Sequence, residues 1–60
     1  MLNIYYSIDP IAKEYEYKVQ DMKSYQVLLN KKYTRKSEFD TDFATVKKTF
    51  PDATLVEVVY

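Results

Sequence analysis

The chain has no covalent or metal support for its fold, and this limits the ways in which it can be stable. It has 60 residues with no cysteine and no histidine, so it offers neither a disulfide nor the usual ligands of a structural zinc ion. A chain of this length buries only about 60% of the surface that its unfolded form exposes, which leaves room for one core. We therefore expect a single domain over residues 1–60, supported by large side chains or by association with a partner.

Large aromatic side chains can support the fold in place of a disulfide or a metal ion. Seven Tyr and three Phe occur in the sequence, and each such ring can bury about 150–250 Å². Glycine is absent, so any turn with a positive φ must be made by another residue, most cheaply by Asn or Asp. The absence of glycine also excludes a glycine-rich phosphate loop.

Two segments near the N-terminus alternate between apolar and polar residues, which predicts half-buried strands. In residues 2–8 one face carries Leu2, Ile4, Tyr6 and Ile8, and the other carries Asn3, Tyr5 and Ser7. In residues 13–19 the inner face carries Tyr15, Tyr17 and Val19. Because Asp9-Pro10 between them favours a turn, we expect an antiparallel hairpin.

Residues 21–33 are compatible with two structures. Asp21 as an N-cap and Asn30 as a left-handed C-cap favour a short helix. Val27 and Leu29 at alternate positions are equally compatible with a strand. We prefer the helix and leave the strand open.

The C-terminal half gives clearer signals. Phe39, Phe43, Val46 and Phe50 form one apolar stripe, which predicts a helix over residues 37–50, capped by Ser37 or Asp40 and ended by Pro51. Residues 54–60 are mostly β-branched and apolar, which predicts a central strand. The fold class expected is α+β: a small antiparallel sheet, made of the N-terminal hairpin and the C-terminal strand, packed on one or two helices.

The sequence lacks the residues that most catalytic sites need. Without His or Cys, the serines, threonines and lysines have no evident general base beside them, so we expect no catalytic residues, no cofactor and no enzyme. Glu38, Asp40 and Asp42 superficially resemble a calcium loop, but Phe43 and Thr49 stand where that loop needs Gly and Glu. We interpret the run as an acidic helix start that matches the helix dipole, with no metal site.

The remaining polar groups suit binding. A basic segment precedes the acidic run, and opposite charges side by side can orient a protein partner. Tyr5 faces outward, and exposed tyrosines are frequent at binding hot spots. The residues expected to contact a partner are Tyr5, Lys31, Lys32, Tyr33, Arg35, Lys36, Glu38, Asp40 and Asp42.

We therefore expect a non-enzymatic protein-binding module, an inhibitor or adaptor that occludes a larger partner. In size and composition the chain resembles the small accessory proteins of phages and mobile elements, a likeness of class that rests on no motif. Two alternatives stay open: a nucleic-acid-binding regulator that uses Lys31, Lys32, Arg35 and Lys36, and a homo-oligomer that pairs through a sheet edge. The net charge of zero and the absence of a long apolar run favour a cytoplasmic protein with no membrane contact.

Overall fold

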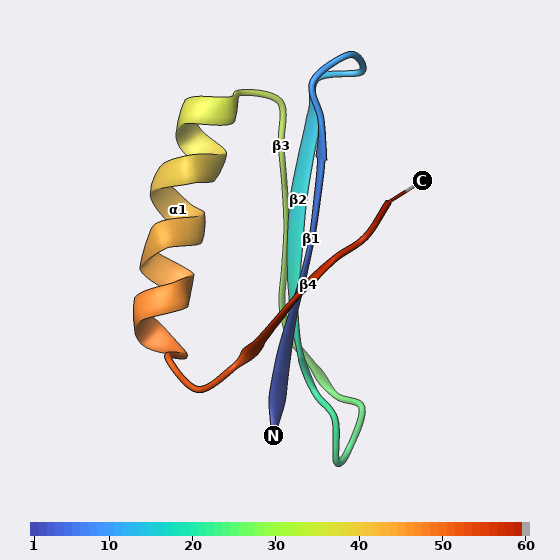
Figure 1. Ribbon diagram of the computed structural model, residues 1–60, viewed down its shortest axis with the longest axis vertical. Coiled ribbons are helices and arrows are strands. Elements are labelled where there is room, and N and C mark those ends of the chain that lie inside the picture. Colours follow the sequence, from blue (N-terminus) through green and yellow to red (C-terminus); the bar gives the residue numbers. More distant parts are fainter. Residues whose placement is uncertain (60) are drawn as a thin grey trace.

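A computed structural model describes residues 1–59 and shows one four-stranded sheet with one helix on one side of it (Figure 1). The elements follow the order β1 (Leu2–Asp9), β2 (Glu14–Asp21), β3 (Val27–Tyr33), α1 (Lys36–Thr49) and β4 (Thr54–Glu57). In the sheet the strands lie in the order β3-β2-β1-β4. The expected α+β class and the N-terminal hairpin are confirmed.

The sheet is mixed. β2 pairs antiparallel with both β1 and β3, whereas β4 pairs parallel with β1. The reason is the single helix between β3 and β4, which returns the chain along the sheet so that the next strand runs in the direction of β3. The prediction that the C-terminal strand is central was wrong, because this crossover delivers β4 to the edge beside β1. The part of that prediction on Tyr60 lies outside the described residues.

The preferred helix over residues 21–33 was also wrong. β2 runs to Asp21, a short turn follows, and β3 pairs with β2 through contacts such as Val19 with Leu29 and Tyr15 with Tyr33. This pairing places Tyr33 against the aromatic core, which a helix in that position would not do. Asn30 is not a helix cap, and the positive φ values fall on Lys13 (55°) and Tyr25 (62°).

The helix α1 confirms the apolar stripe of its sequence. Phe39 and Val46 are buried, and Phe43 and Phe50 pack partly buried against the core. The prediction of a cap at Ser37 or Asp40 was wrong: the N-cap is Arg35, whose side chain makes no capping hydrogen bond. Pro51 follows the helix directly, as expected.

The core between α1 and the sheet is mainly aromatic. Ring contacts with centroid distances from 5.0 to 6.3 Å join six rings in one cluster, formed by Tyr6, Tyr15, Tyr17, Tyr33, Phe39 and Phe43. Phe39, Ile4 and Val19 are fully buried. Since each aromatic pair adds about 0.5–1.5 kcal/mol beyond its burial, this cluster supplies the support that a disulfide or a metal provides in other small domains.

Candidate functional site

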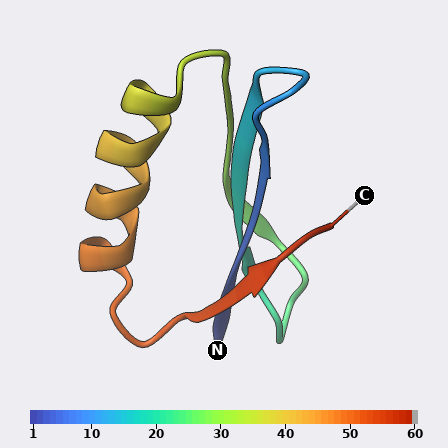
Figure 2. The same ribbon diagram turned by 45° about the horizontal axis from the view of Figure 1, so that its top comes forward.

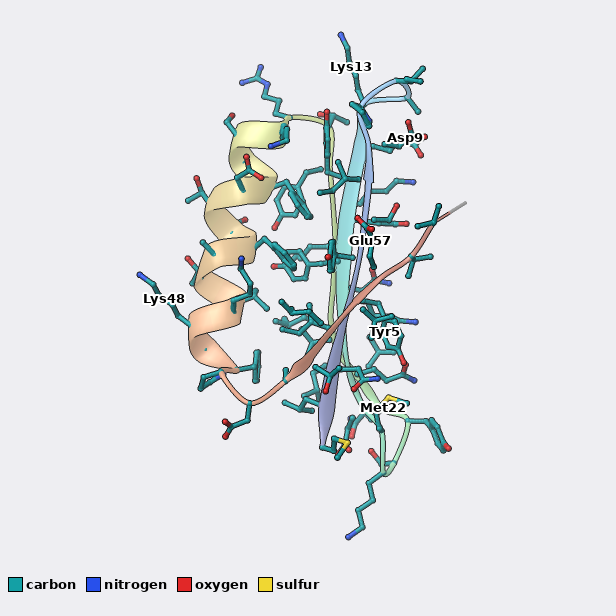
Figure 3. The ribbon with its side chains drawn as sticks, in the orientation of Figure 1. Tyr5, Asp9, Lys13, Met22, Lys48 and Glu57 are labelled. Carbon is teal, nitrogen blue, oxygen red and sulfur yellow. The ribbon has the colours of Figure 1, made fainter. Side chains whose placement is uncertain are left out.

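Within residues 1–59, no helix or strand covers one side of the sheet. The helix lies on the other side in both ribbon views (Figures 1 and 2). Tyr5 and Met22 lie on the side away from α1, while Lys48 points outward from the helix (Figure 3). We call the uncovered side the open face. Cross-strand pairing assigns to it Tyr5, Ser7, Glu16, Lys18, Asn30 and Lys32.

A shallow hollow of about 280 Å³ lies on the open face. Its lining includes Ser7, Glu16 and Lys18 from the central strands, Asn30 from β3, and Val58 from the chain that follows β4. Val58 reaches this place because its N–H donates to the Tyr6 carbonyl at 2.8 Å. The hollow is close in size to a small ligand pocket or to a site for a partner's side chain; the Lys18 ammonium and the Asn30 amide line it, while Ser7 is only 4% exposed.

Tyr5 is held at the centre of this surface. Its hydroxyl accepts a hydrogen bond from the Asn3 amide nitrogen at 3.2 Å and donates to the Met22 sulfur at 3.5 Å. The Lys18 ammonium lies 5.1 Å from the centre of its ring, within the range of a cation–π contact. Because these contacts fix the ring before any partner arrives, little side-chain entropy is lost when it is buried.

The β2–β3 loop is a second ordered feature. The Asp21 N–H donates to the Gln26 carbonyl at 2.9 Å, and the Tyr25 N–H donates to the Asp21 carbonyl at 2.7 Å. The Gln20 side chain donates to the Tyr25 carbonyl at 3.0 Å. The N–H of Lys23 donates to the Asp21 carboxylate at 2.9 Å, and this bond holds the pKa of that carboxyl below its usual value.

These bonds hold Tyr25 in a left-handed conformation with its side chain 69% exposed. A left-handed conformation costs about 1–2 kcal/mol in a residue with a Cβ atom. The backbone of Tyr25 is thus strained, while its exposed ring lies outside the core. Strain of this kind is concentrated at functional sites, so Tyr25 is a candidate contact residue.

Apolar side chains surround the open face. The β1–β2 loop, the β2–β3 loop and the chain after β4 all extend toward the side away from α1 (Figures 1 and 2). Each carries one strongly exposed large apolar side chain: Ile11 (95%), Tyr25 (69%) and Val59 (81%). We call these three residues the rim. Isolated exposed apolar residues are ordinary, and these three lie on separate segments instead of in one contiguous patch; their segments extend to the same side of the sheet, which makes them candidate contact residues.

The structure divides the basic segment predicted to form one site. Lys31 pairs with the buried Tyr17 and therefore lies on the helix side of the sheet, whereas Lys32 pairs with Glu16 on the open face. Adjacent strand residues point to opposite sides, so the two lysines do not form one group on the open face. Of the predicted contact residues, Tyr5 and Lys32 share the open face.

The other predicted contact residues lie around the start of α1. The Tyr33 hydroxyl donates to the Asp42 carboxylate at 2.7 Å, and burial together with this bond raises the pKa of Tyr33 well above its usual value. Lys36 and Asp40 form an exposed ion pair at 3.0 Å. Arg35 and Glu38 are exposed. Tyr33 and Asp42 thus join the helix to the sheet instead of forming a free surface.

Sequence reasoning missed the rim. Ile11 and Val59 carry no periodic signal, and Tyr25 lies within residues 21–33, for which a helix was preferred that does not form. One signal was present for Tyr25, since a chain without glycine must place other residues in its positive-φ turns.

Comparison with known proteins gave no matching family model, no matching curated protein and no matching solved structure. Among residues 1–59, no three carboxylate, His or Cys side chains lie close enough together to hold a metal ion. No helix in the same part of the chain has the length and apolar character needed to cross a membrane. The fold and the surface together define a small tyrosine-rich α+β protein with one uncovered sheet face.

Proposed function

We propose that this chain is a non-enzymatic binding module of the cytoplasm that attaches to a partner protein through the open face and the rim. It acts as an inhibitor or adaptor by covering part of that partner. The observation that carries the proposal is the position of the rim: Ile11, Tyr25 and Val59 are exposed on segments that extend toward the uncovered side.

The chemistry of the surface supports a protein partner. Tyrosine is enriched in binding hot spots because it combines a large rigid ring with a polar tip. Tyr5 offers such a ring at the centre, and Tyr25 offers another at the edge of the same surface. Across the sheet from Tyr5, Lys18 and Asn30 supply hydrogen-bonding groups of the kind that give an interface its specificity.

The cost of Tyr25 supports the same conclusion. Asn or Gly would adopt the left-handed conformation with less strain, so a tyrosine there lowers the stability of a very small domain. Such a residue is expected where the binding free energy that its ring contributes exceeds the loss in the free energy of unfolding.

Photo-crosslinking from single positions tests the proposal. A benzophenone amino acid is placed at Ile11 or Tyr25, and at Lys48 on the outer side of α1 as the control. In lysate, we expect one protein to crosslink from both rim positions and not from Lys48. Crosslinks from Lys48 alone, or none from either rim position, would contradict the proposal.

A second candidate function is nucleic-acid binding, favoured by the contact of Lys18 with the Tyr5 ring on the open face. A ring beside a cation is the arrangement that stacks bases and contacts phosphates. A gel-shift assay at low salt separates the two functions. Strong, salt-sensitive retardation, lost when Lys18 and Lys32 on the open face are replaced by Glu, would favour nucleic acid over a protein partner.

A further inference from the structure

The outer edge of β3 has backbone groups that no strand of the sheet uses. The N–H of Val58 donates to the Tyr6 carbonyl, so Tyr6 directs its backbone groups toward β4. Successive residues of a strand direct their N–H and C=O groups to alternate edges of the strand. The pairing register then shows which residues of β2 and β3 bond to which neighbouring strand. In β3, Leu29, Lys31 and Tyr33 therefore bond to β2, while Asn30 and Lys32 direct their N–H and C=O groups outward.

The same two residues belong to the open face. Asn30 lines the hollow, and Lys32 lies opposite Glu16. A strand added beside β3 would therefore extend the open face and place every second side chain next to the hollow. The edge and the open face form one continuous surface.

Charge selects the kind of strand that fits. From Val27 to Ser37 the chain carries four cations and no anion; Lys36 already pairs with Asp40, so Lys31 and Lys32 on the strand and Arg35 just beyond it carry the positive charge at this edge. Arg35 makes no capping bond, so its guanidinium is not used to begin the helix. A second copy of β3 would bring more cations to this edge, and like charges oppose such pairing. An acidic segment would neutralise them.

The start of β3 has a different character. Val27 and Leu28 are each 45% exposed, beside the shift in register between Val19 and Gln20. The edge is thus apolar at its first residues and basic at its last ones. An antiparallel partner strand meets the basic end first, so it would be acidic in its N-terminal half and apolar in its C-terminal half.

We propose that the outer edge of β3 accepts an extended segment of the partner protein as an additional antiparallel strand, acidic first and apolar second. The inference rests on the proposed protein-binding function and adds the chemistry of the partner segment. Backbone bonds to Asn30 and Lys32 hold the segment, and side chains select it.

The test uses ¹⁵N-labelled full-length protein and the synthetic peptide Glu-Asp-Glu-Asp-Thr-Val-Thr-Val-Thr. We expect hydrogen exchange to slow at the amides of Asn30 and Lys32, by about tenfold when the peptide concentration is roughly nine times its Kd. The amides of Leu29 and Lys31 already bond to β2 and should not change. The peptide with its halves exchanged should bind more weakly.

Two variants make the test specific to the edge. Asn30→Pro removes an outward N–H, which an edge strand tolerates, and should abolish peptide binding while Asn30→Thr keeps it. Circular dichroism checks that both variants fold. Because proline can disturb β3 itself, Lys31→Glu with Lys32→Glu is a second variant, expected to weaken binding roughly tenfold or more through repulsion.

Several results would overturn the inference. One is no binding of the peptide; another is a change in the chemical shifts of Tyr5 and Lys18 without slower exchange at Asn30 and Lys32. Protection of Asn30 and Lys32 that rises with protein concentration alone would indicate a second copy in place of a partner segment. Rim crosslinks that persist in Asn30→Pro would refute strand addition but leave the proposed function standing. The absence of rim crosslinks when the rest of the sequence is unchanged would refute the proposed function.

Discussion

Replacement of Phe39 tests whether the aromatic cluster supports the fold. Phe39 is 1% exposed and contacts four rings, those of Tyr15, Tyr17, Tyr33 and Phe43. Removing a buried Phe side chain to Ala costs about 3–5 kcal/mol. A domain of this length has a free energy of unfolding of roughly 3–9 kcal/mol, so we expect Phe39→Ala to be largely or wholly unfolded.

Phe39→Leu makes the effect measurable. Leucine fills much of the volume but loses the ring contacts, each worth about 0.5–1.5 kcal/mol, so we expect a loss of roughly 2–3 kcal/mol. With a urea m-value of about 1 kcal/mol/M for so small a protein, the midpoint should fall by roughly 2–3 M. Far-UV circular dichroism during urea titration measures this midpoint.

Phe50→Leu is the matched control. Phe50 lies on the same helical stripe but is only partly buried and lies outside the six-ring cluster. We expect it to lower the free energy of unfolding by less than about 1.5 kcal/mol. Equal shifts for the two leucine variants would refute the view that stability is concentrated in ring contacts around Phe39.

Three further changes test individual features. The pKa of Tyr33 is raised in the folded state, so the neutral hydroxyl stabilises the fold. This contribution to the free energy of unfolding is complete below about pH 10, the ordinary tyrosine pKa, and is lost as the pH rises above it. Tyr33→Phe should therefore lower the free energy of unfolding by about 1 kcal/mol at neutral pH. The difference in urea midpoint between this variant and the unmodified protein should shrink above pH 10. A difference that stays constant would count against the bond to Asp42. Tyr25→Asn should raise the free energy of unfolding by about 1 kcal/mol, because Asn adopts the left-handed conformation more readily, and should weaken rim crosslinking from Ile11; a lower melting temperature would show that the ring stabilises the fold. Arg35→Ser should stabilise α1 by about 1 kcal/mol through a new N-cap bond, measured by thermal melting, and no gain would mean that the helix start is already satisfied.

The candidate site was only partly predictable from sequence. Alternation in residues 2–8 assigned Tyr5 to the outer face, and the structure confirms this position. The basic segment was treated as one group, but Lys31 and Lys32 lie on opposite sides of the sheet. The difference follows from the change of helix to strand, since neighbouring residues in a strand point in opposite directions.

The sequence alone determined the elements with strong periodic patterns. The alternation around Ile4 and Tyr17 specified the N-terminal hairpin, and the stripe from Phe39 to Phe50 specified the helix and the side that it buries. These patterns repeat over a short stretch of chain, so each can be recognised without knowledge of its neighbours.

Tertiary structure decided the rest. Residues 27–33 fit a helix or a strand equally well, and pairing with β2 selected the strand because it gave Leu29 and Tyr33 contacts with the core. The crossover through α1 then placed β4 at an edge and left one side of the sheet uncovered. The absence of cysteine, histidine and glycine limited how this chain could be stable, but only the packed structure showed that six rings support it and that Tyr25 bears the strain of a turn.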